Sequence, residues 1–272
     1  MSLNLKILNL DWDKVIEKII DFIKEKVNNS KSNGIVLGLS GGLDSSVVAM
    51  LCVKALGKDK VIGLILPDER ITPKEDIKDA IELAEKLGIK YYIIKIDDIY
   101  NAFSSINPIH NENNKVACGN LRARIRMALL YYFANANNFL VAGTGDKSEI
   151  LIGYFTKFGD GAADLLPIGD LYKTQVRMFA KYLGLPNKII EKPSSPRLWK
   201  NHLAEKEIGL DYKTIDLILY GLFDLKMEKE EIASKFNISK NIIEKVINMV
   251  KNSQHKRSMP PIAKISNFLV IL

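Results

Sequence analysis

Small and hydroxyl-bearing residues gather between residues 38 and 46, where the chain reads Gly-Leu-Ser-Gly-Gly-Leu-Asp-Ser-Ser. Gly41 and Gly42 carry no Cβ atom, so the backbone can close around a phosphate group, and the serine hydroxyls add donors. The segment lacks the Gly-Lys-Ser/Thr ending of a Walker A loop, and it does not match Gly-x-Gly-x-x-Gly. Asp44 would repel a phosphate unless a divalent cation lay between them. We therefore predict a phosphate loop that works with a metal ion; the competing interpretation is an ordinary glycine turn.

The elements predicted around this loop place it at the edge of a parallel sheet. Short apolar runs predict buried strands at residues 34–39, 61–66, 91–96 and 139–142. Apolar spacing and Pro or Gly boundaries predict helices at residues 11–29, 44–56, 73–87, 120–135 and 172–183. This alternation predicts an α/β fold with a doubly wound parallel sheet, followed by a helical C-terminal part at residues 211–252. The loop joins the first strand to the next helix, whose free N–H groups and positive dipole end favour an anion.

The composition fits a globular protein of a reducing compartment. The 272 residues are 47% hydrophobic and 26% charged, which excludes wholesale disorder. We expect that the two cysteines, Cys52 and Cys118, cannot build a disulfide framework or a four-ligand zinc site. No export signal or membrane span is recognisable, because the longest uncharged run, residues 127–145, contains three asparagines. We expect residues 1–272 to form a single domain in the cytoplasm, without a membrane partner.

The basic balance leaves a nucleic-acid partner to be considered, since the net charge is +7 and the pI about 9.1. Residues 227–246 resemble a helix-turn-helix, with Ser239 as the cap of the second helix. That helix carries Lys240 and Lys245 but also Glu244, and no arginine or glutamine that could read base edges. A DNA-binding protein is therefore a distant alternative, and we expect no nucleic-acid partner.

Ser-Gly-Gly-x-Asp-Ser after a strand resembles the pyrophosphate loop of the ATP pyrophosphatases (the PP-loop superfamily), which split ATP between its α and β phosphates. Four later segments are similar to motifs of the ammonia-dependent NAD synthetases, with Asp146 where asparagine is usual. They are Cys118-Gly-Asn-Leu-Arg-Ala-Arg-Ile-Arg-Met127, Gly143-Thr-Gly-Asp-Lys-Ser-Glu149, Gly153-Tyr-Phe-Thr-Lys-Phe-Gly-Asp-Gly-Ala-Ala-Asp-Leu-Leu-Pro167, and His255-Lys-Arg257 followed by Pro260-Pro261. These motifs span nearly the whole chain, which is identified as a member of the NAD synthetase family.

The resemblance implies an activity, namely the amidation of deamido-NAD (nicotinic acid adenine dinucleotide) by ammonia. ATP would form an NAD-adenylate with release of pyrophosphate, and ammonia would then displace AMP to give NAD, the final step of NAD biosynthesis. Such chemistry requires the protein to screen charge, position two anions and exclude water, and it needs no nucleophilic side chain. The resemblance also implies Mg²⁺ as cofactor and a homodimer.

Site residues follow from the matched motifs. A Mg²⁺ pair is implied at Asp44 and Glu149, with Asp160 as a candidate for a second ion. The residues expected to contact ATP are Gly38, Leu39, Ser40, Gly41, Gly42, Leu43, Asp44, Ser45, Thr144, Lys173 and Ser195. Those expected to contact deamido-NAD, with tail residues completing the site across the dimer interface, are Arg124, Lys157, Asp164, His255 and Lys256.

The matched motifs leave the arginine run at residues 122–126 and the segment at residues 193–205 unresolved. Helical spacing puts Arg122 and Arg126 on one face and Arg124 on nearly the opposite face, so they cannot all serve one ligand. The family motif selects Arg124, and we expect the other two to form structural ion pairs. Residues 193–205 depart from the family's usual stretch, because its Gly-Gln-Thr-Asp is missing, and we expect His202 within it to be a surface histidine.

Other enzymes that share the phosphate loop remain as alternatives. A tRNA-modifying PP-loop pyrophosphatase would also be basic, but its thiolating members usually carry paired cysteines. Electron-transfer flavoproteins would lack Glu149 and the loop at residues 157–164. Glutamine-dependent NAD synthetases carry an added nitrilase-like domain, for which the sequence before residue 34 is far too short. We therefore expect no glutaminase domain and ammonia as the nitrogen donor.

Overall fold

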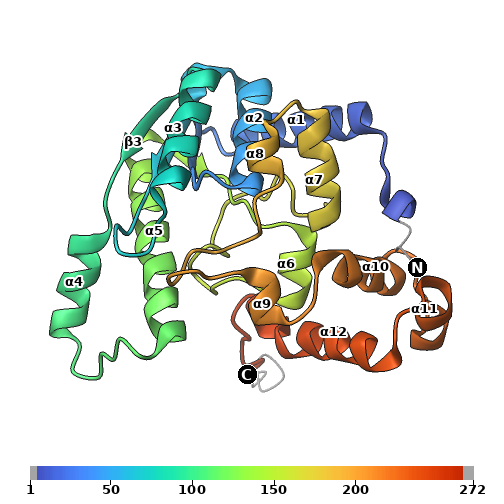
Figure 1. The fold of residues 1–272 in the computed structure, drawn as a ribbon. Helices are drawn as coiled ribbons and strands as arrows, with labels where there is room; N and C mark the ends of the chain where they lie inside the picture. Colours follow the sequence, from blue (N-terminus) through green and yellow to red (C-terminus); the bar gives the residue numbers. More distant parts are fainter. Residues whose placement is uncertain (1–4, 266–272) are drawn as a thin grey trace, which may run out of the picture.

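The computed structural model describes residues 5–265, which contain a sheet of four parallel strands (Figure 1). The strands are β1 (Gly34–Gly38), β2 (Val61–Ile65), β3 (Lys90–Ile93) and β4 (Phe139–Val141), in the order β3-β2-β1-β4. The chain builds outward from β1 to β3 and then returns to add β4 on the other side of β1. In such sheets a ligand cleft forms at the carboxyl ends where the strand order reverses, here between β1 and β4.

Helices account for most of the remaining structure. They are α1 (Trp12–Asn29), α2 (Leu43–Leu56), α3 (Lys74–Leu87), α4 (Asp97–Ile106), α5 (Lys115–Asn137), α6 (Lys147–Ile152), α7 (Lys173–Tyr182), α8 (Asn187–Ile190), α9 (Ala204–Ile208), α10 (Tyr212–Phe223), α11 (Lys229–Phe236) and α12 (Lys240–Asn252). Every strand and helix predicted from the sequence is present, although β3 ends earlier and α5 begins earlier than predicted. The helices α4, α6, α8 and α9 were not predicted; α8 and α9 are single turns, too short for a periodic pattern.

Alternate side chains of the central strands enter two apolar cores, because successive residues point to opposite faces of a sheet. Ile35 and Leu37 of β1 pack with α1, α2, α3 and α7, whereas Val36 packs with α4 and α5. Helices therefore cover both faces of the parallel sheet, and the predicted doubly wound α/β fold is confirmed.

The predicted helical C-terminal part is present (Figure 1), and its helices build a third core beside the sheet. Ile215 and Leu219 of α10 pack there with Ile232 of α11 and Ile243 of α12. Ile152 of α6 joins this core, so the C-terminal helices are attached to the element that follows β4. Among residues 5–265, none of the helices combines the length and the apolar character that crossing a bilayer requires.

Candidate active site

A cavity of about 620 Å³ lies at the carboxyl ends of β1, β2 and β4. Its lining includes the residues that follow these three strands, namely Leu39, Leu66 and Thr144. Residues of α5 and of the glycine-rich loop after α6 (residues 153–169) also line it. The predicted site residues that line this cavity are Gly38, Leu39, Ser40, Asp44, Ser45, Thr144, Glu149, Asp160, Ser195 and Lys256. Residues far apart in the sequence thus meet where the topology of the sheet places a ligand.

The predicted phosphate loop runs from the end of β1 into α2. Gly42 is the N-cap of α2 and makes no side-chain cap hydrogen bond, so N–H groups of the first helical turn face outward without a helix partner. The Oγ atoms of Ser40 and Ser45 lie 3.0 Å apart, and the Gly42 N–H donates to Ser40 Oγ at 3.2 Å. These contacts hold the loop open toward the cavity, which is the arrangement that binds an anion at a helix N-terminus.

Gly41 is required by the shape of this loop. Its φ of +70° lies in the left-handed region, and a Cβ built on it would come within 2.0 Å of the Asp76 carbonyl oxygen of α3. Its own carbonyl accepts a hydrogen bond from Lys192 Nζ at 2.8 Å. Only glycine allows this close approach of loop and helix.

Three carboxylates surround one buried ammonium beside the loop. Lys173 Nζ lies 2.8 Å from Asp44 Oδ2, 2.8 Å from Asp146 Oδ2 and 2.8 Å from Glu149 Oε1, and its side chain is fully buried. The carboxylates come from α2 and from the start of α6, whereas the lysine begins α7. The structure therefore brings the predicted metal pair Asp44 and Glu149 together, and it places Lys173 behind them rather than in the cavity wall.

Burial and mutual charge shift the ionisation of this group. Burial raises the pKa of Asp146, and it raises the pKa of Glu149 well above its usual value, to which the Asp146 charge adds. Burial would lower the pKa of Lys173, but the carboxylates around it raise that pKa well above its ordinary value. Lys173 is therefore a permanent cation, while Asp146 and Glu149 bind a proton more readily than free carboxylates do.

A second buried carboxylate positions the lysine. Asp216 of α10 accepts hydrogen bonds from Ser148 Oγ at 2.5 Å and from the N–H and Oγ1 of Thr174, at 2.8 and 2.7 Å. Ser148 Oγ in turn accepts from the N–H of Lys173 at 2.9 Å. Burial raises the pKa of Asp216 to about 7. The C-terminal helices therefore fix the start of α7, and with it the ammonium.

Residues predicted to hold the dinucleotide fall into two places. Arg124 donates to the Lys157 carbonyl at 3.2 Å, and Lys157 Nζ donates to the His255 carbonyl at 2.7 Å. These three residues therefore form one cluster beside Lys256, the member of the group that lines the cavity. Asp164 stands apart, where its Oδ2 accepts from the N–H of Val141 at the end of β4.

The expectation for the arginine run is half confirmed. Arg122 is buried and pairs with Asp68, with Nε 2.7 Å from Oδ2, as expected of a structural arginine. For Arg126 the expectation was wrong, because among residues 5–265 its guanidinium forms no ion pair within 4 Å. Its Nε donates to the Leu66 carbonyl at 2.9 Å, the side chain lines the cavity, and burial lowers its pKa to about 10. Arg126 thus adds a positive charge to the wall of the cavity, where an anionic ligand can reach it.

The expectation that His202 is a surface residue was also wrong. Its ring is 2% exposed, lines the cavity and stacks on Trp199, with ring centroids 3.4 Å apart. Its Nε2 lies 2.7 Å from Glu207 Oε2 and 3.1 Å from Tyr154 Oη. Burial lowers the pKa of His202. The spacing of residues in the sequence does not predict this burial, because it depends on the tertiary contacts of the segment.

The divergent segment that carries these residues is tied to the phosphate loop. Arg197 Nε and Lys192 Nζ lie 2.7 and 2.8 Å from the carboxylate oxygens of Asp76, and the Oγ of Ser195 donates to the His202 carbonyl. Ion pairs from α3 therefore hold this segment over the cavity, even though its letters depart from the family's usual stretch.

In α11 and α12, which resemble a helix-turn-helix in sequence, lysine side chains contact other groups of the same chain. Lys240 Nζ lies 3.1 Å from Glu230 Oε1, and Lys245 Nζ donates to the Ile208 carbonyl at 2.7 Å. Ile243 and Val246 are buried in the third core. The pattern is that of two helices packed into a larger structure.

Comparisons with known proteins give a consistent result. The family model described as NAD synthase matches residues 15–260. The NH(3)-dependent NAD(+) synthetase of Staphylothermus marinus is 53% identical over 259 residues, which are 95% of this chain and 94% of that protein. The solved NMN synthetase from Francisella tularensis aligns with a TM-score of 0.83 at 35% identity, covering 94% of this chain and 100% of that one. The NH3-dependent NAD synthetase from Campylobacter jejuni, solved with nitrate, has a TM-score of 0.78 at 38% identity and the same coverage.

Proposed function

Because this chain belongs to the NAD synthase family, we propose that it joins ammonia to the carboxylate of deamido-NAD with cleavage of ATP to AMP and pyrophosphate. It is a ligase, and the curated relatives favour this function over tRNA modification or DNA binding. The observation that carries the proposal is the convergence of the phosphate loop and the carboxylates of Asp44 and Glu149 in one cavity.

The phosphate loop would hold the pyrophosphate end of ATP. The N–H groups at the start of α2 and the hydroxyls of Ser40 and Ser45 are oriented by contacts within the loop before any ligand arrives. Preorganised donors of this kind stabilise charge that develops on the leaving pyrophosphate without a cost of reorganisation. Thr144, after β4, lines the same cavity and would contact the nucleoside side of the ligand.

The carboxylates beside the loop fit Mg²⁺. Asp44 Oδ1 is buried and has no hydrogen-bond partner among residues 5–265, and oxygen is the ligand that this ion prefers. When all are ionised, three carboxylates and the Lys173 ammonium leave two negative charges, which one divalent cation neutralises. We infer that Asp44 and Glu149 hold the ion, and that Asp160, on the same cavity, is the candidate for a second one. When bound, the ion would screen the phosphate charge. Lys173 holds Asp44 and Glu149, the two ligands of the ion, in place.

The acid substrate would be positioned by cations that line the same cavity. Arg126 and Lys256 both line the cavity, and Lys256 Nζ is oriented by the Gly153 and Phe155 carbonyls, each at 2.8 Å. No side chain needs to act as a nucleophile, because ATP itself activates the carboxylate. The work of the protein is to align two anions and to keep water from the adenylate, and the anchored segment at residues 192–202 serves that end.

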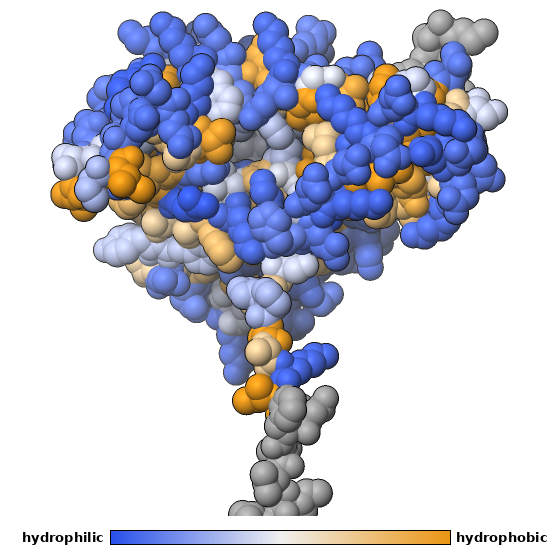
Figure 2. Space-filling model, turned by 90° about the horizontal axis from the view of Figure 1, so that it is seen from below, coloured by the Kyte–Doolittle hydropathy of each residue, from blue (hydrophilic) through white to orange (hydrophobic). Residues whose placement is uncertain are grey.

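A homodimer is part of the proposal. Apolar side chains are exposed on α4, α5 and the segment between them, and Figure 2 shows apolar residues gathered at the left edge, the side on which α4 lies in Figure 1. The exposed residues of this face are Ile99, Phe103, Ile106, Ile109, Val116 and Tyr132. A face of this kind is typical of an interface between copies. We place the enzyme in the cytoplasm, where both buried cysteines stay reduced.

One assay tests the proposal. The purified chain is incubated with deamido-NAD, ATP, Mg²⁺ and ammonium, and NAD, AMP and pyrophosphate are quantified. Equal amounts of the three products are expected, and glutamine in place of ammonium should give no turnover. Formation of ADP and phosphate would reject adenylation, and appreciable turnover with glutamine would reject ammonia as the sole nitrogen donor.

A second candidate is the amidation of nicotinic acid mononucleotide, favoured by the likeness to an NMN synthetase at a TM-score of 0.83. The two reactions share the ATP half of the site and differ only in the length of the acid substrate. Measuring kcat/KM for both acids with the same enzyme decides between them. A higher value for the mononucleotide would replace deamido-NAD as the substrate.

A further inference from the structure

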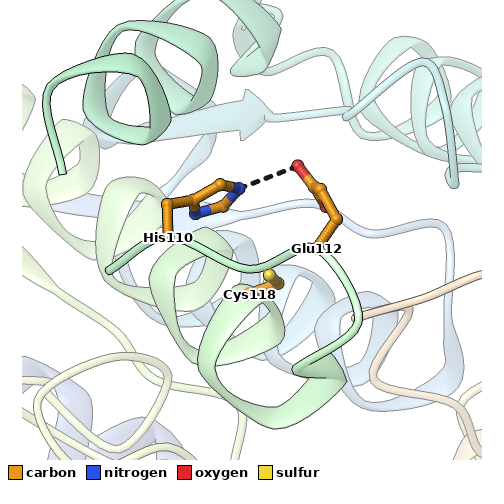
Figure 3. A group of neighbouring side chains, drawn as sticks. All are labelled: His110, Glu112 and Cys118. Carbon is orange, nitrogen blue, oxygen red and sulfur yellow. Dashed lines mark hydrogen bonds and ion pairs between the residues drawn. The ribbon is translucent and has the colours of Figure 1, made fainter. Parts of the chain in front are cut away.

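Three side chains with different metal-binding atoms converge between α4 and α5, away from the cavity (Figure 3). They are His110, Glu112 and Cys118, whose ligand atoms all lie within 4.8 Å of one another. His110 Nε2 lies 3.1 Å from Glu112 Oε1, and in Figure 3 the ring and the carboxylate point toward each other above the Cys118 sulfur. The sequence predicted no role for any of the three.

The surrounding structure holds these groups in place. Tyr100 of α4 is fully buried, and its hydroxyl donates to the Glu112 carboxylate, with oxygen distances of 3.1 and 3.2 Å. The edge of the His110 ring packs against the same tyrosine, with centroids 6.0 Å apart. Cys118 lies in the first turns of α5 and is 4% exposed, with its Sγ 3.4 Å from the Asn111 carbonyl. A buried scaffold therefore fixes all three side chains, as outer contacts do for metal ligands.

We propose that His110, Glu112 and Cys118 form a binding site for a zinc-type divalent cation. One imidazole nitrogen, one carboxylate oxygen and one thiolate are the donor types that Zn²⁺ accepts, and a water molecule completes four-coordination. A thiolate does not suit Mg²⁺, so this site is chemically distinct from the carboxylate pair at the phosphate loop. Binding removes the thiol proton of Cys118 to the solvent, and the sulfur then gives up its contact with the Asn111 carbonyl.

The ion would tie the segment at residues 107–114 to the first turns of α5. The wall of the cavity includes Val116 and Asn120 of the same turns. Tyr100 Oη and Cys118 Sγ already contact this segment at Glu112 and Asn111, and an ion bound to all three ligands would add a further bridge between the segment and α5. The inference does not depend on which acid the enzyme amidates.

The test uses Co²⁺ as a spectroscopic stand-in for Zn²⁺ on the purified full chain, freed of metal and kept in excess Mg²⁺. Excess Mg²⁺ occupies the carboxylate site, and only a cysteine ligand gives the intense thiolate-to-cobalt absorption in the near ultraviolet. We expect one Co²⁺ per chain with that band, and its displacement by one equivalent of Zn²⁺. Cys118→Ser should abolish the band, and Glu112→Gln and His110→Gln should weaken binding more than about tenfold.

Cys52→Ala is the matched control, because Cys52 is the other buried cysteine and burial raises its thiol pKa to about 12. It should keep the full band and affinity. Glu112 is exposed, so Glu112→Gln tests the site even where Cys118→Ser folds poorly. Zn²⁺ should also raise the melting temperature of the wild type but not of Glu112→Gln. Absence of the band in the wild type, or equal binding by Glu112→Gln and wild type, overturns the proposal.

Discussion

Replacement of Lys173 by methionine separates the electrostatic role of this residue from its bulk. Methionine has a similar length and no charge, so the substitution removes the ammonium and keeps most of the packing. The variant leaves three carboxylates together without their shared cation, since Asp44, Asp146 and Glu149 each lie 2.8 Å from Lys173 Nζ.

The magnitude follows from the burial of the group. Removing one partner of a fully buried ion pair costs about 3–5 kcal/mol, because the remaining charge is left uncompensated in a poorly solvated site. For a chain of this size that corresponds to a fall of roughly 6–20 °C in melting temperature. A divalent cation at about a hundred times its dissociation constant would return about 2.7 kcal/mol. In EDTA the variant should therefore have a lower free energy of unfolding than the wild type. Mg²⁺ should restore part of this loss, and the increase that Mg²⁺ causes should be larger in the variant than in the wild type.

The assay is thermal and urea unfolding of wild type and Lys173→Met, each in EDTA and in millimolar Mg²⁺. Lys240→Met is the control, since both side chains of the Lys240–Glu230 ion pair are exposed and its loss should leave the melting temperature nearly unchanged. Equal stability of Lys173→Met and wild type in EDTA would refute the reasoning. So would an Mg²⁺ response of the variant that is no larger than that of the wild type.

Three further substitutions probe the remaining parts of the site. Asp44→Asn should raise the Mg²⁺ concentration needed for half-maximal NAD formation while the circular dichroism spectrum stays that of the wild type; an unchanged Mg²⁺ requirement would remove Asp44 as a ligand. Gly41→Ala should raise the KM for ATP and lower the free energy of unfolding by about 1–3 kcal/mol, since its Cβ would meet the Asp76 carbonyl at φ +70°, and an unaffected KM would show that the loop tolerates the change. The pKa of Asp216 is about 7 in the folded state and about 3.9 in the unfolded state, so the folded state binds this proton more tightly. The stability that protonated Asp216 contributes is full below about pH 4 and is lost as the pH rises through about 7. Asp216→Asn should flatten the fall in unfolding free energy between these pH values, and an identical slope in urea titrations would contradict the assignment.

The local chemistry of the phosphate loop could be predicted from the sequence, because it depends on neighbouring residues. Two glycines, three serines and an aspartate between an apolar run and a helical pattern are enough to place an anion site at a strand–helix junction. The same reasoning found the strands and the long helices, whose periodicity is a local property. It missed α4, which has amphipathic spacing but presents Phe103 and Ile106 to solvent rather than to the core of this chain.

Arg126 shows how a correct pattern can give a wrong role. Helical spacing predicted that Arg126 and Arg124 lie on different faces of α5, and in the structure they contact different segments. The spacing does not predict which segments pack against each face. One face of α5 meets the end of β2, so Arg126 reaches the cavity, while Arg124 is exposed and contacts the glycine-rich loop.

By itself the sequence determined the family and the α/β fold, since each rests on motifs or apolar runs whose residues are close together in the chain. Tertiary structure alone decided which charges meet. Lys173 and Asp44 are 129 residues apart, and their ion pair exists because α2 and α7 pack on the same face of the sheet. The burial of His202 was decided in the same way, by the ion pairs that hold its segment over the cavity. Pairing energies in a buried site depend on distance and desolvation, and neither is encoded in the spacing of residues along the chain.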